Sequence, residues 1–220
     1  MHPHIPFMIA VDGPAGAGKG TLAKHLAEVY DFAYLDTGLL YRAIAYEMLQ
    51  NGYDLADVQL AEKIAGSLDP ATFKESALRD EAVGGAASFI SAYPGVRAAL
   101  LKFQRHFAQH PPFFKKGAVL DGRDIGTVIL PEAQAKIFVT ADLEIRAKRR
   151  FKEMHERGIE SRYEAIFEEM QSRDLRDEVR KISQLKPAED ALIIDTSHLN
   201  IEEVFLCAQD FVSEKLKTSL

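Results

Sequence analysis

Hydrophobic residues follow two different spacings along this chain, and the two spacings alternate. Short apolar runs are typical of buried β-strands, whereas longer stretches with an apolar residue every three or four positions are typical of amphipathic helices. Because strands and helices take turns, the pattern predicts one α/β domain whose five-stranded parallel sheet carries helices on both faces. The expected strands are residues 5–11, 32–36, 118–121, 136–140 and 191–195, and the expected helices are residues 19–30, 39–51, 96–109, 143–157, 162–181 and 201–217.

Two regions interrupt this alternation. Residues 53–92 predict a mostly helical excursion, and residues 156–163 predict a charged turn between two helices, centred on Gly158. A chain of 220 residues is long enough for one substantial core. We therefore expect a single domain with a core of residues 1–52, 93–150 and 185–220, an excursion at 53–92 and a lid at 151–184. Asn200 followed by Glu203 predicts the start of the last helix.

A glycine-rich segment directly follows the first expected strand and opens the first expected helix. A structural turn needs one or two glycines, whereas this segment has four together with a lysine at the helix start, which favours a P-loop that binds nucleotide phosphates. Glycines let successive backbone N–H groups point at one anion, and the helix N-terminus adds partial positive charge. The expected ATP-binding residues are Gly13, Pro14, Ala15, Gly16, Ala17, Gly18, Lys19, Gly20 and Thr21.

Composition narrows the classes of protein further. The net charge of −6 argues against a general nucleic-acid surface, although 12 of the 27 lysines and arginines lie between residues 146 and 186. No apolar run is long enough to predict a membrane span, and the seven histidines are scattered rather than spaced as metal ligands. The single cysteine, Cys207, excludes an internal disulfide and is expected to be a packed thiol. We expect a cytoplasmic monomer that binds neither membranes nor nucleic acid.

Several motifs together resemble bacterial cytidylate kinases, which belong to the nucleoside monophosphate kinases. The resemblance covers most of residues 5–215. It is carried by IAVDGPAGAGKGTLAK at the phosphate loop, by Asp36-Thr37-Gly38 with Tyr41-Arg42, by Ser88 and Arg97, by Asp121-Gly122-Arg123-Asp124-Ile125-Gly126-Thr127 and by the run from Arg173 to Arg180. It implies a P-loop NTPase fold with acceptor-binding and lid excursions, and Mg²⁺-dependent phosphoryl transfer from ATP to CMP or dCMP.

The resemblance also implies a role for individual residues. The implied catalytic residues are Lys19, Asp121, Arg123, Arg146 and Arg150, and Thr21 and Asp121 are the implied Mg²⁺ contacts, direct or through water. The implied CMP-binding residues are Thr37, Tyr41, Arg42, Ser88, Arg97, Arg123, Asp124, Arg173, Asp177 and Arg180.

Taken by themselves, several of these residues have simpler interpretations. Thr37 fits a helix N-cap and Arg42 an exposed arginine on that helix, and Asp121-Gly122 is a common turn dipeptide. The basic helices after residue 143 also carry many acidic residues, as a solvated helix pair does. Those alternatives stay open at the level of sequence.

The resemblance has one departure, because residues 67–81 stand where bacterial cytidylate kinases usually carry a longer insert with a small antiparallel sheet. Alternative functions are phosphorylation of UMP, AMP or shikimate, and nucleotide binding without catalysis. A GTPase is not supported, since neither Asn51 nor Asn200 is followed by the lysine of a guanine-binding Asn-Lys-x-Asp segment.

Overall fold

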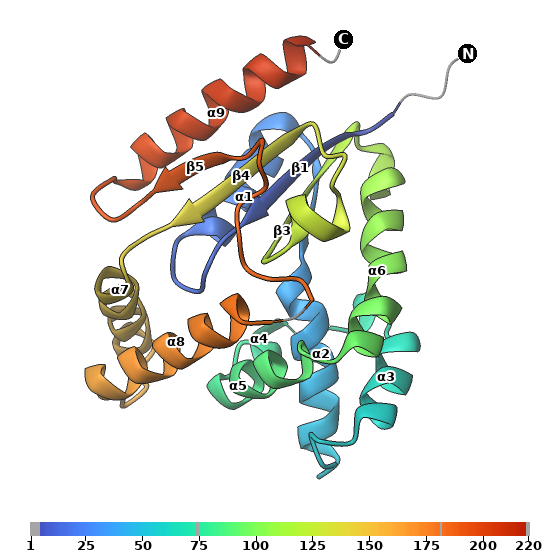
Figure 1. Cartoon of the computed structure of the whole chain (residues 1–220), viewed down its shortest axis with the longest axis vertical. Coiled ribbons are helices and arrows are strands. Elements are labelled where there is room, and N and C mark those ends of the chain that lie inside the picture. The colour runs from blue at the N-terminus through green and yellow to red at the C-terminus, as the bar shows by residue number, and fades with distance from the viewer. Residues whose placement is uncertain (1–4, 74, 181, 219–220) are drawn as a thin grey trace. The chain divides into compact units, whose positions relative to one another are not determined.

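A computed structural model describes residues 5–73, 75–180 and 182–218 (Figure 1). The chain divides into two compact units. The first combines Met1–Leu35 with Ala108–Leu220, and the second is Asp36–Phe107. The two units are described separately below.

A five-stranded sheet is the centre of the first unit. Its strands are β1 (Phe7–Asp12), β2 (Ala33–Asp36), β3 (Gly117–Gly122), β4 (Ala135–Thr140) and β5 (Leu192–Asp195), in the order β2-β3-β1-β4-β5. β1 pairs in parallel with β3 on one side and with β4 on the other, and β4 pairs in parallel with β5. The predicted class, an α/β fold built on a parallel sheet, is confirmed.

The chain leaves the central strand β1 toward one side of the sheet and later returns to fill the other side. In open α/β sheets, ligands bind at the carboxyl ends of the strands where the order reverses in this way. The segments that follow β1, β3, β4 and β5 all begin at this edge. The topology therefore predicts that functional residues lie on those four segments.

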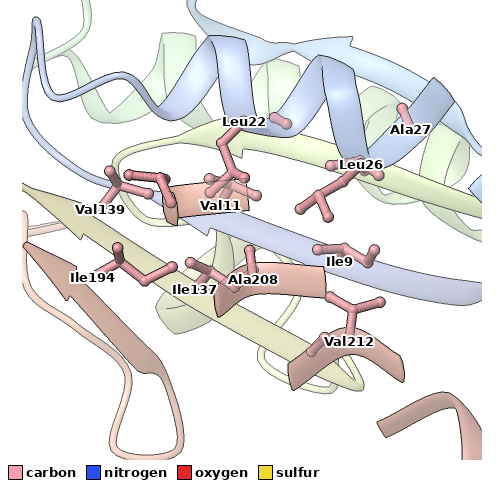
Figure 2. Close-up of a cluster of buried hydrophobic side chains, with 14 of the residues drawn as sticks. Ile9, Val11, Leu22, Leu26, Ala27, Ile137, Val139, Ile194, Ala208 and Val212 are labelled. Atoms are coloured by element: carbon pink, nitrogen blue, oxygen red, sulfur yellow. The ribbon is translucent and has the colours of Figure 1, made fainter. Parts of the chain in front are cut away.

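Helices α1 (Lys19–Tyr30) and α9 (Ile201–Thr218) cover one face of the sheet. Figure 2 shows their buried side chains, among them Leu26 and Val212, packed with Ile9 and Ile137 of the strands. The unit also contains η2 (Pro112–Phe114), the π-helical turn η3 (Ile125–Ile129), α7 (Leu143–Glu156) and α8 (Tyr163–Glu178). None of the helices in the described ranges is long and apolar enough to cross a membrane.

The second unit is helical. It contains α2 (Thr37–Gln50), α3 (Val58–Gly66), η1 (Pro70–Thr72), α4 (Glu75–Leu78), α5 (Glu81–Ile90) and most of α6 (Pro94–Gln109). Its own apolar core includes Leu40, Ile44 and Met48 of α2, packed with Ile90 of α5 and Leu100 of α6. The helical character predicted for residues 53–92 is confirmed. Residues 67–81, of which Lys74 is not described, hold η1 and α4 where the family pattern would place a small antiparallel sheet.

Most predicted boundaries agree with the structure to within two residues, and two local expectations are wrong. The second helix begins at Thr37 itself, so Asp36 rather than Thr37 occupies the N-cap position, without a side-chain cap bond. Cys207 is exposed rather than packed, because Val204 and Ala208 take the buried positions of α9. The helix expected at 162–181 ends at Glu178, where Leu185 N–H donates back to the Asp177 carbonyl.

The start of α9 yields a stability prediction. The Asn200 side chain accepts from Glu203 N–H at 3.0 Å, and the Glu203 carboxylate accepts from Asn200 N–H at 2.8 Å, which is the predicted capping box. Asn200→Ala should lower the free energy of unfolding by about 1 kcal/mol, measured by urea titration. Glu203→Gln keeps a side-chain oxygen and should cost less. An unchanged urea midpoint in Asn200→Ala would contradict a stabilising cap.

Candidate functional site

The phosphate loop joins the end of β1 to the start of α1, as predicted. Gly16 and Gly18 have φ angles of +74° and +93°, which side chains with a Cβ rarely adopt. A Cβ on Gly13 would lie 2.0 Å from the carbonyl oxygen of Val139 on β4, so a larger residue there would displace backbone. Glycine is therefore required at these positions by backbone geometry, and the loop lies against the neighbouring strand.

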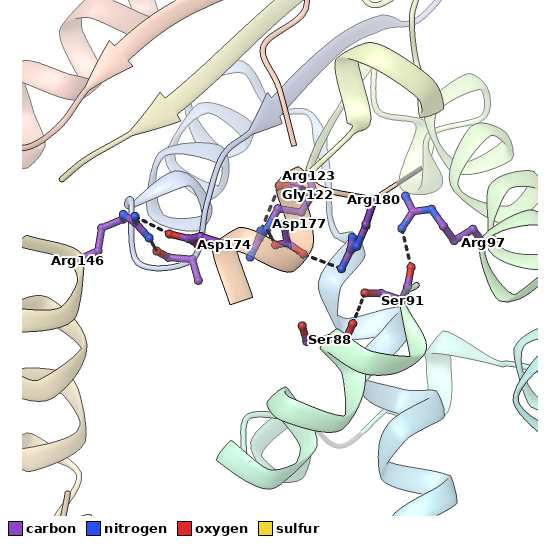
Figure 3. Close-up of polar contacts among 10 residues, drawn as sticks. Ser88, Ser91, Arg97, Gly122, Arg123, Arg146, Asp174, Asp177 and Arg180 are labelled. Atoms are coloured by element: carbon purple, nitrogen blue, oxygen red, sulfur yellow. Dashed lines mark hydrogen bonds and ion pairs between the residues drawn. The ribbon is translucent and has the colours of Figure 1, made fainter. Parts of the chain in front are cut away.

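Arg146 of α7 forms a hydrogen bond with the backbone of this loop. Its guanidinium donates to the Ala15 carbonyl at 3.2 Å, to the Ala141 carbonyl at 2.8 Å and to the Asp174 carboxylate of α8 at 2.7 Å (Figure 3). The residue is buried, with a relative exposure of 5%. Three protein oxygens thus hold Arg146, and the contacts tie the phosphate loop to both helices of the predicted lid.

Asp121 lies at the carboxyl end of β3, beside the first turn of α1. The Tyr34 hydroxyl donates to Asp121 Oδ1 at 3.1 Å, and a Cβ on Gly20 would lie 3.4 Å from Asp121 Oδ2. Lys19 is the first residue of α1, and Thr21 is exposed two positions later. The structure therefore brings a buried carboxylate next to the predicted phosphate lysine and the helix start.

This donor set fits a magnesium ion that is held largely by nucleotide phosphates. Mg²⁺ usually keeps several waters and takes one or two carboxylates, rather than filling a cage of protein ligands. Among the residues that the structure describes, no group of three His, Cys, Asp or Glu side chains could hold a metal ion alone. Asp121 can supply one oxygen or orient the ion's waters.

Arginines gather around Asp177 near the end of α8. Arg123 Nε donates to Asp177 Oδ2 at 3.0 Å, and Arg180 Nη2 pairs with Asp177 Oδ1 at 2.6 Å (Figure 3). Burial alone would raise the pKa of Asp177, but Arg123, Arg180 and Arg173 outweigh it and hold that pKa below its ordinary value. Arg173 and Asp177 lie four residues apart on α8, whereas Arg180 follows the end of that helix at Glu178.

Asp12, the last residue of β1, links the phosphate loop to the segment after β3. Side chains alternate along a strand, so Asp12 points away from the face that Val11 shares with α1. Its carboxylate accepts from Ile125 N–H and Gly126 N–H, each at 2.7 Å, at the start of η3. The pKa of Asp12 is raised from an ordinary 3.8 to about 7, chiefly by burial and with a smaller contribution from the nearby Asp124 carboxylate, which together outweigh the lowering by the two N–H groups and by Arg123.

In the second unit, Arg42 extends from α2 to the turn between α4 and α5. Its Nη1 donates to the Leu78 carbonyl at 2.8 Å and to the Asp80 carbonyl at 3.1 Å. A Cβ on Gly84 of α5 would lie 2.8 Å from Arg42 Nη2, so the glycine leaves room for the guanidinium. Thr37 and Tyr41 lie on the same helix and are buried. Arg42 is therefore engaged by the backbone of the helical excursion.

Arg97 and Ser88 also lie in the second unit and share a short polar network. Arg97 of α6 donates to the Ser91 carbonyl at 3.1 Å, and Ser91 Oγ donates to the Ser88 carbonyl at 2.9 Å (Figure 3). The Arg97 guanidinium also lies over the Tyr41 ring, 5.6 Å from its centre. The structure thus brings Tyr41, Ser88 and Arg97 together within one unit.

The two helices of the predicted lid, α7 and α8, pack through an apolar cluster of their own that includes Met154, Ile166 and Met170. Gly158 has a φ of +70° in the turn between them, as a residue after a helix end often does. Arg150 pairs with Glu153 on the same helix at 2.7 Å. These two helices therefore pack against each other as a pair.

Sequence reasoning did not assign three of the residues that organise this unit: Asp12, Arg149 and Thr196. Thr196 follows β5 and donates to the Ala17 carbonyl of the phosphate loop at 3.0 Å. Asp12 was visible as a charge at the end of an apolar strand, which is a usable signal of a functional strand end. Thr196 follows a strand too, but no local pattern connects it with a loop 179 residues earlier.

Comparisons with known proteins agree with these motifs. A family model described as cytidylate kinase matches residues 9–213. Cytidylate kinases from Paramagnetospirillum magneticum and Rhodospirillum rubrum are 51% and 48% identical, each over 94% of this chain and 98% of their own length. One from Rhodopseudomonas palustris is 53% identical over 93% of this chain and 95% of its own. These relatives are thus similar to this chain in overall length.

Solved structures add information on the fold alone. An uncharacterized protein from Eubacterium ventriosum is 16% identical, with a TM-score of 0.51, over 95% of this chain and 98% of its own. A sugar kinase from Janibacter sp. is 12% identical, with a TM-score of 0.50, over 94% of this chain and 95% of its own.

The raised pKa of Asp12 predicts how stability changes with pH. The folded protein binds this proton up to about pH 7 and the unfolded chain only up to about pH 4, so the stability it contributes is present below pH 4 and is lost as pH rises through 7. The slope is at most about 1.4 kcal/mol per pH unit. Asp12→Asn removes this titration and presents an amide N–H to a backbone N–H, which should cost about 1–3 kcal/mol.

Urea titrations of both proteins between pH 5 and pH 8 provide the measurement. The stability advantage of the unmodified protein over Asp12→Asn should be largest at pH 5 and should shrink toward pH 8. A difference that does not change with pH would contradict the raised pKa.

Proposed function

Since the chain belongs to the cytidylate kinase family, we propose that it transfers the γ-phosphoryl group of ATP to CMP, giving ADP and CDP, and that dCMP is an acceptor too. The observation that carries this proposal is the pairing of β1 with β3. Val11 lies opposite Asp121 and Asp12 opposite Gly122, so the phosphate loop and the segment of Arg123 and Asp124 continue from adjacent strand ends.

On the donor side, the phosphate loop binds the phosphates of ATP. Phosphoryl transfer is catalysed mainly by positioning and by neutralising charge on the transferring group. Lys19 supplies a mobile positive charge at the start of α1, and the loop's backbone N–H groups supply fixed partial charges. The proposed ATP-binding residues are those of the loop from Gly13 to Thr21. Mg²⁺ would be held by Asp121 and Thr21, directly or through water, and would neutralise phosphate charge.

On the acceptor side, arginines bind the phosphate of CMP. Arg123 and Arg180 are already oriented by Asp177, and a guanidinium presents a planar fork of donors that suits a phosphate. We assign Asp124 to the cytosine because a carboxylate accepts from its amino group. The full proposed set is Thr37, Tyr41, Arg42, Ser88, Arg97, Arg123, Asp124, Arg173, Asp177 and Arg180.

Arg146 and Arg150 of α7 complete the proposed catalytic set with Lys19, Asp121 and Arg123. Arg146 is held by three protein oxygens, one each at Nε, Nη1 and Nη2. A guanidinium has five N–H donors, so Arg146 can contact the transferring phosphoryl group while it keeps these three contacts. Arg150 lies one helical turn further along α7 and is partly exposed. Lid arginines of this kind would neutralise the phosphoryl group and exclude the water that would otherwise hydrolyse ATP.

We further propose that the protein acts as a monomer in the cytoplasm. A single, exposed cysteine suits a reducing compartment.

A coupled assay of ATP consumption tests the proposed function. CMP, dCMP, UMP, AMP and shikimate are offered separately to the same enzyme preparation with Mg²⁺. We expect kcat/KM to be highest for CMP and dCMP. A higher value for UMP, AMP or shikimate would overturn the acceptor assignment, and ATP or ADP binding without turnover on any acceptor would identify a nucleotide-binding homologue without catalysis.

Replacement of Lys19 tests the charge that the loop supplies. Lys19→Ala should keep the fold and lower kcat for CMP by roughly 10²–10³-fold, because it removes one preorganised charge from the transferring phosphate. Lys24→Ala is the matched control. Lys24 lies on the same helix and is exposed, 5.7 Å from the centre of the Tyr34 ring. Near-normal turnover by a folded Lys19→Ala protein would contradict the assignment.

Asp124→Asn tests how the base is selected. Uracil presents a carbonyl where cytosine has its amino group, so the Asp124 carboxylate should repel UMP while an amide can donate to it. The ratio of kcat/KM for CMP to that for UMP should fall at least about tenfold, equivalent to ~1.4 kcal/mol.

Arg97→Ala is the comparison variant for this experiment, since it should weaken CMP without improving UMP. Equal losses on both acceptors in Asp124→Asn would assign Asp124 to ordering the site rather than to the base.

A further inference from the structure

Thr196 lies directly after β5 and connects a lid helix to the phosphate loop. Its hydroxyl donates to the Ala17 carbonyl at 3.0 Å. Arg149 of α7 donates from Nη1 to the same hydroxyl at 2.9 Å and from Nη2 to the Thr196 carbonyl at 2.6 Å. Thr196 N–H in turn donates to the Thr140 carbonyl of β4 at 2.8 Å, and the residue is buried, with a relative exposure of 4%.

The arginine fixes the direction of this short chain of hydrogen bonds. A guanidinium can donate but cannot accept, so the hydroxyl must accept from Arg149. Its single hydrogen then stays available for the Ala17 carbonyl. Arg149 donates hydrogen bonds to both the hydroxyl and the carbonyl of Thr196. This pair of hydrogen bonds limits rotation of the threonine side chain. The threonine hydroxyl is thereby committed to one acceptor.

Holding a carbonyl in a peptide also holds the N–H on its other side. The peptide unit is planar and trans, so the Ala17 carbonyl and the Gly18 N–H point in opposite directions. Gly18 is the N-cap residue of α1 and has a left-handed backbone conformation. When Thr196 holds the Ala17 carbonyl, the Gly18 N–H is turned away from Thr196. Arg146 acts in the same way on the Ala15 carbonyl and therefore on the Gly16 N–H.

We propose that Thr196 and Arg149 are positioning residues that hold the Ala17–Gly18 peptide so that its N–H faces the phosphates of the bound nucleotide. The proposal rests on the proposed function for the identity of the anion. Neither residue needs to touch the nucleotide. A correctly turned loop binds phosphate without a reorganisation at the moment of binding, so loss of the hydroxyl should weaken phosphate binding itself.

The test compares Thr196→Val, which has nearly the same shape without the hydroxyl, with Thr196→Ser, which keeps it. Binding of ADP and of inorganic pyrophosphate, each with Mg²⁺, is measured by calorimetry on the folded proteins. Thr196→Val should weaken both ligands at least about tenfold, since a buried carbonyl and a guanidinium donor lose their partner. Thr196→Ser should stay within about threefold of the unmodified protein.

Arg149→Ala provides a second variant, and Lys148→Ala is its matched control. Lys148 is the adjacent basic residue of α7, with a side chain that is 63% exposed. Arg149→Ala should weaken ADP and pyrophosphate as Thr196→Val does, whereas Lys148→Ala should not. In the kinase assay, Thr196→Val should raise KM for ATP and leave KM for CMP within about twofold. If Thr196→Val does not fold, the pyrophosphate affinity of Arg149→Ala decides.

Two results would overturn the proposal. Unchanged affinity for both ligands in Thr196→Val and Arg149→Ala would show that the loop is set without them. Weaker ADP binding with unchanged pyrophosphate binding would mean that the two residues act on another part of the nucleotide. The proposed function fails in a different way: the unmodified protein would not phosphorylate CMP, while the pyrophosphate affinities of the variants would still decide the role of Thr196.

Discussion

The proposed function requires backbone N–H groups of the phosphate loop to point toward a single anion, and several contacts of the first unit meet this requirement. A peptide N–H cannot be aimed without aiming the carbonyl on its other side. The carbonyl groups of the loop must therefore point away from the ligand, where they need hydrogen-bond donors from the surrounding protein. Arg146 and Thr196 supply those outer contacts at Ala15 and Ala17, while the left-handed conformations of Gly16 and Gly18 supply the backbone freedom.

At the carboxyl ends of the strands, hydrogen bonds connect the segments that follow neighbouring strands. The Asp12 carboxylate at the end of β1 accepts from two N–H groups at the start of η3. It therefore connects the start of the phosphate loop with the residues that directly follow Arg123 and Asp124. The π-helical hydrogen bonds of η3, such as Leu130 N–H to the Ile125 carbonyl at 2.7 Å, leave the turn wide. The first N–H groups of any helix lack a partner within the helix, and at the start of η3 those of Ile125 and Gly126 donate to Asp12 instead.

The sequence was sufficient for the individual strands, for the start of α1 at Lys19 and for the capping box of Asn200, because each depends on residues close together in the chain. Local patterns also located the glycines and the arginines near Asp177. They could not reveal that Arg146 would be buried among three oxygens, or that Thr196 would reach Ala17, since those contacts depend on tertiary packing. Cys207 was mispredicted for a related reason: its helix has several apolar positions, and packing decides which of them faces the sheet.

Asp177 allows several arginines to lie close together when no anion is bound. Like charges repel, and unpaired guanidinium groups lose much of their hydration when they are partly buried. One carboxylate offsets this cost and fixes the planes of Arg123 and Arg180. Together with Arg173, which also acts on the pKa of Asp177, the group keeps a formal charge of +2. A phosphate monoester carries a charge of about −1.5 to −2 at pH 7. Binding of such an acceptor would therefore neutralise the net positive charge of the three arginines and Asp177.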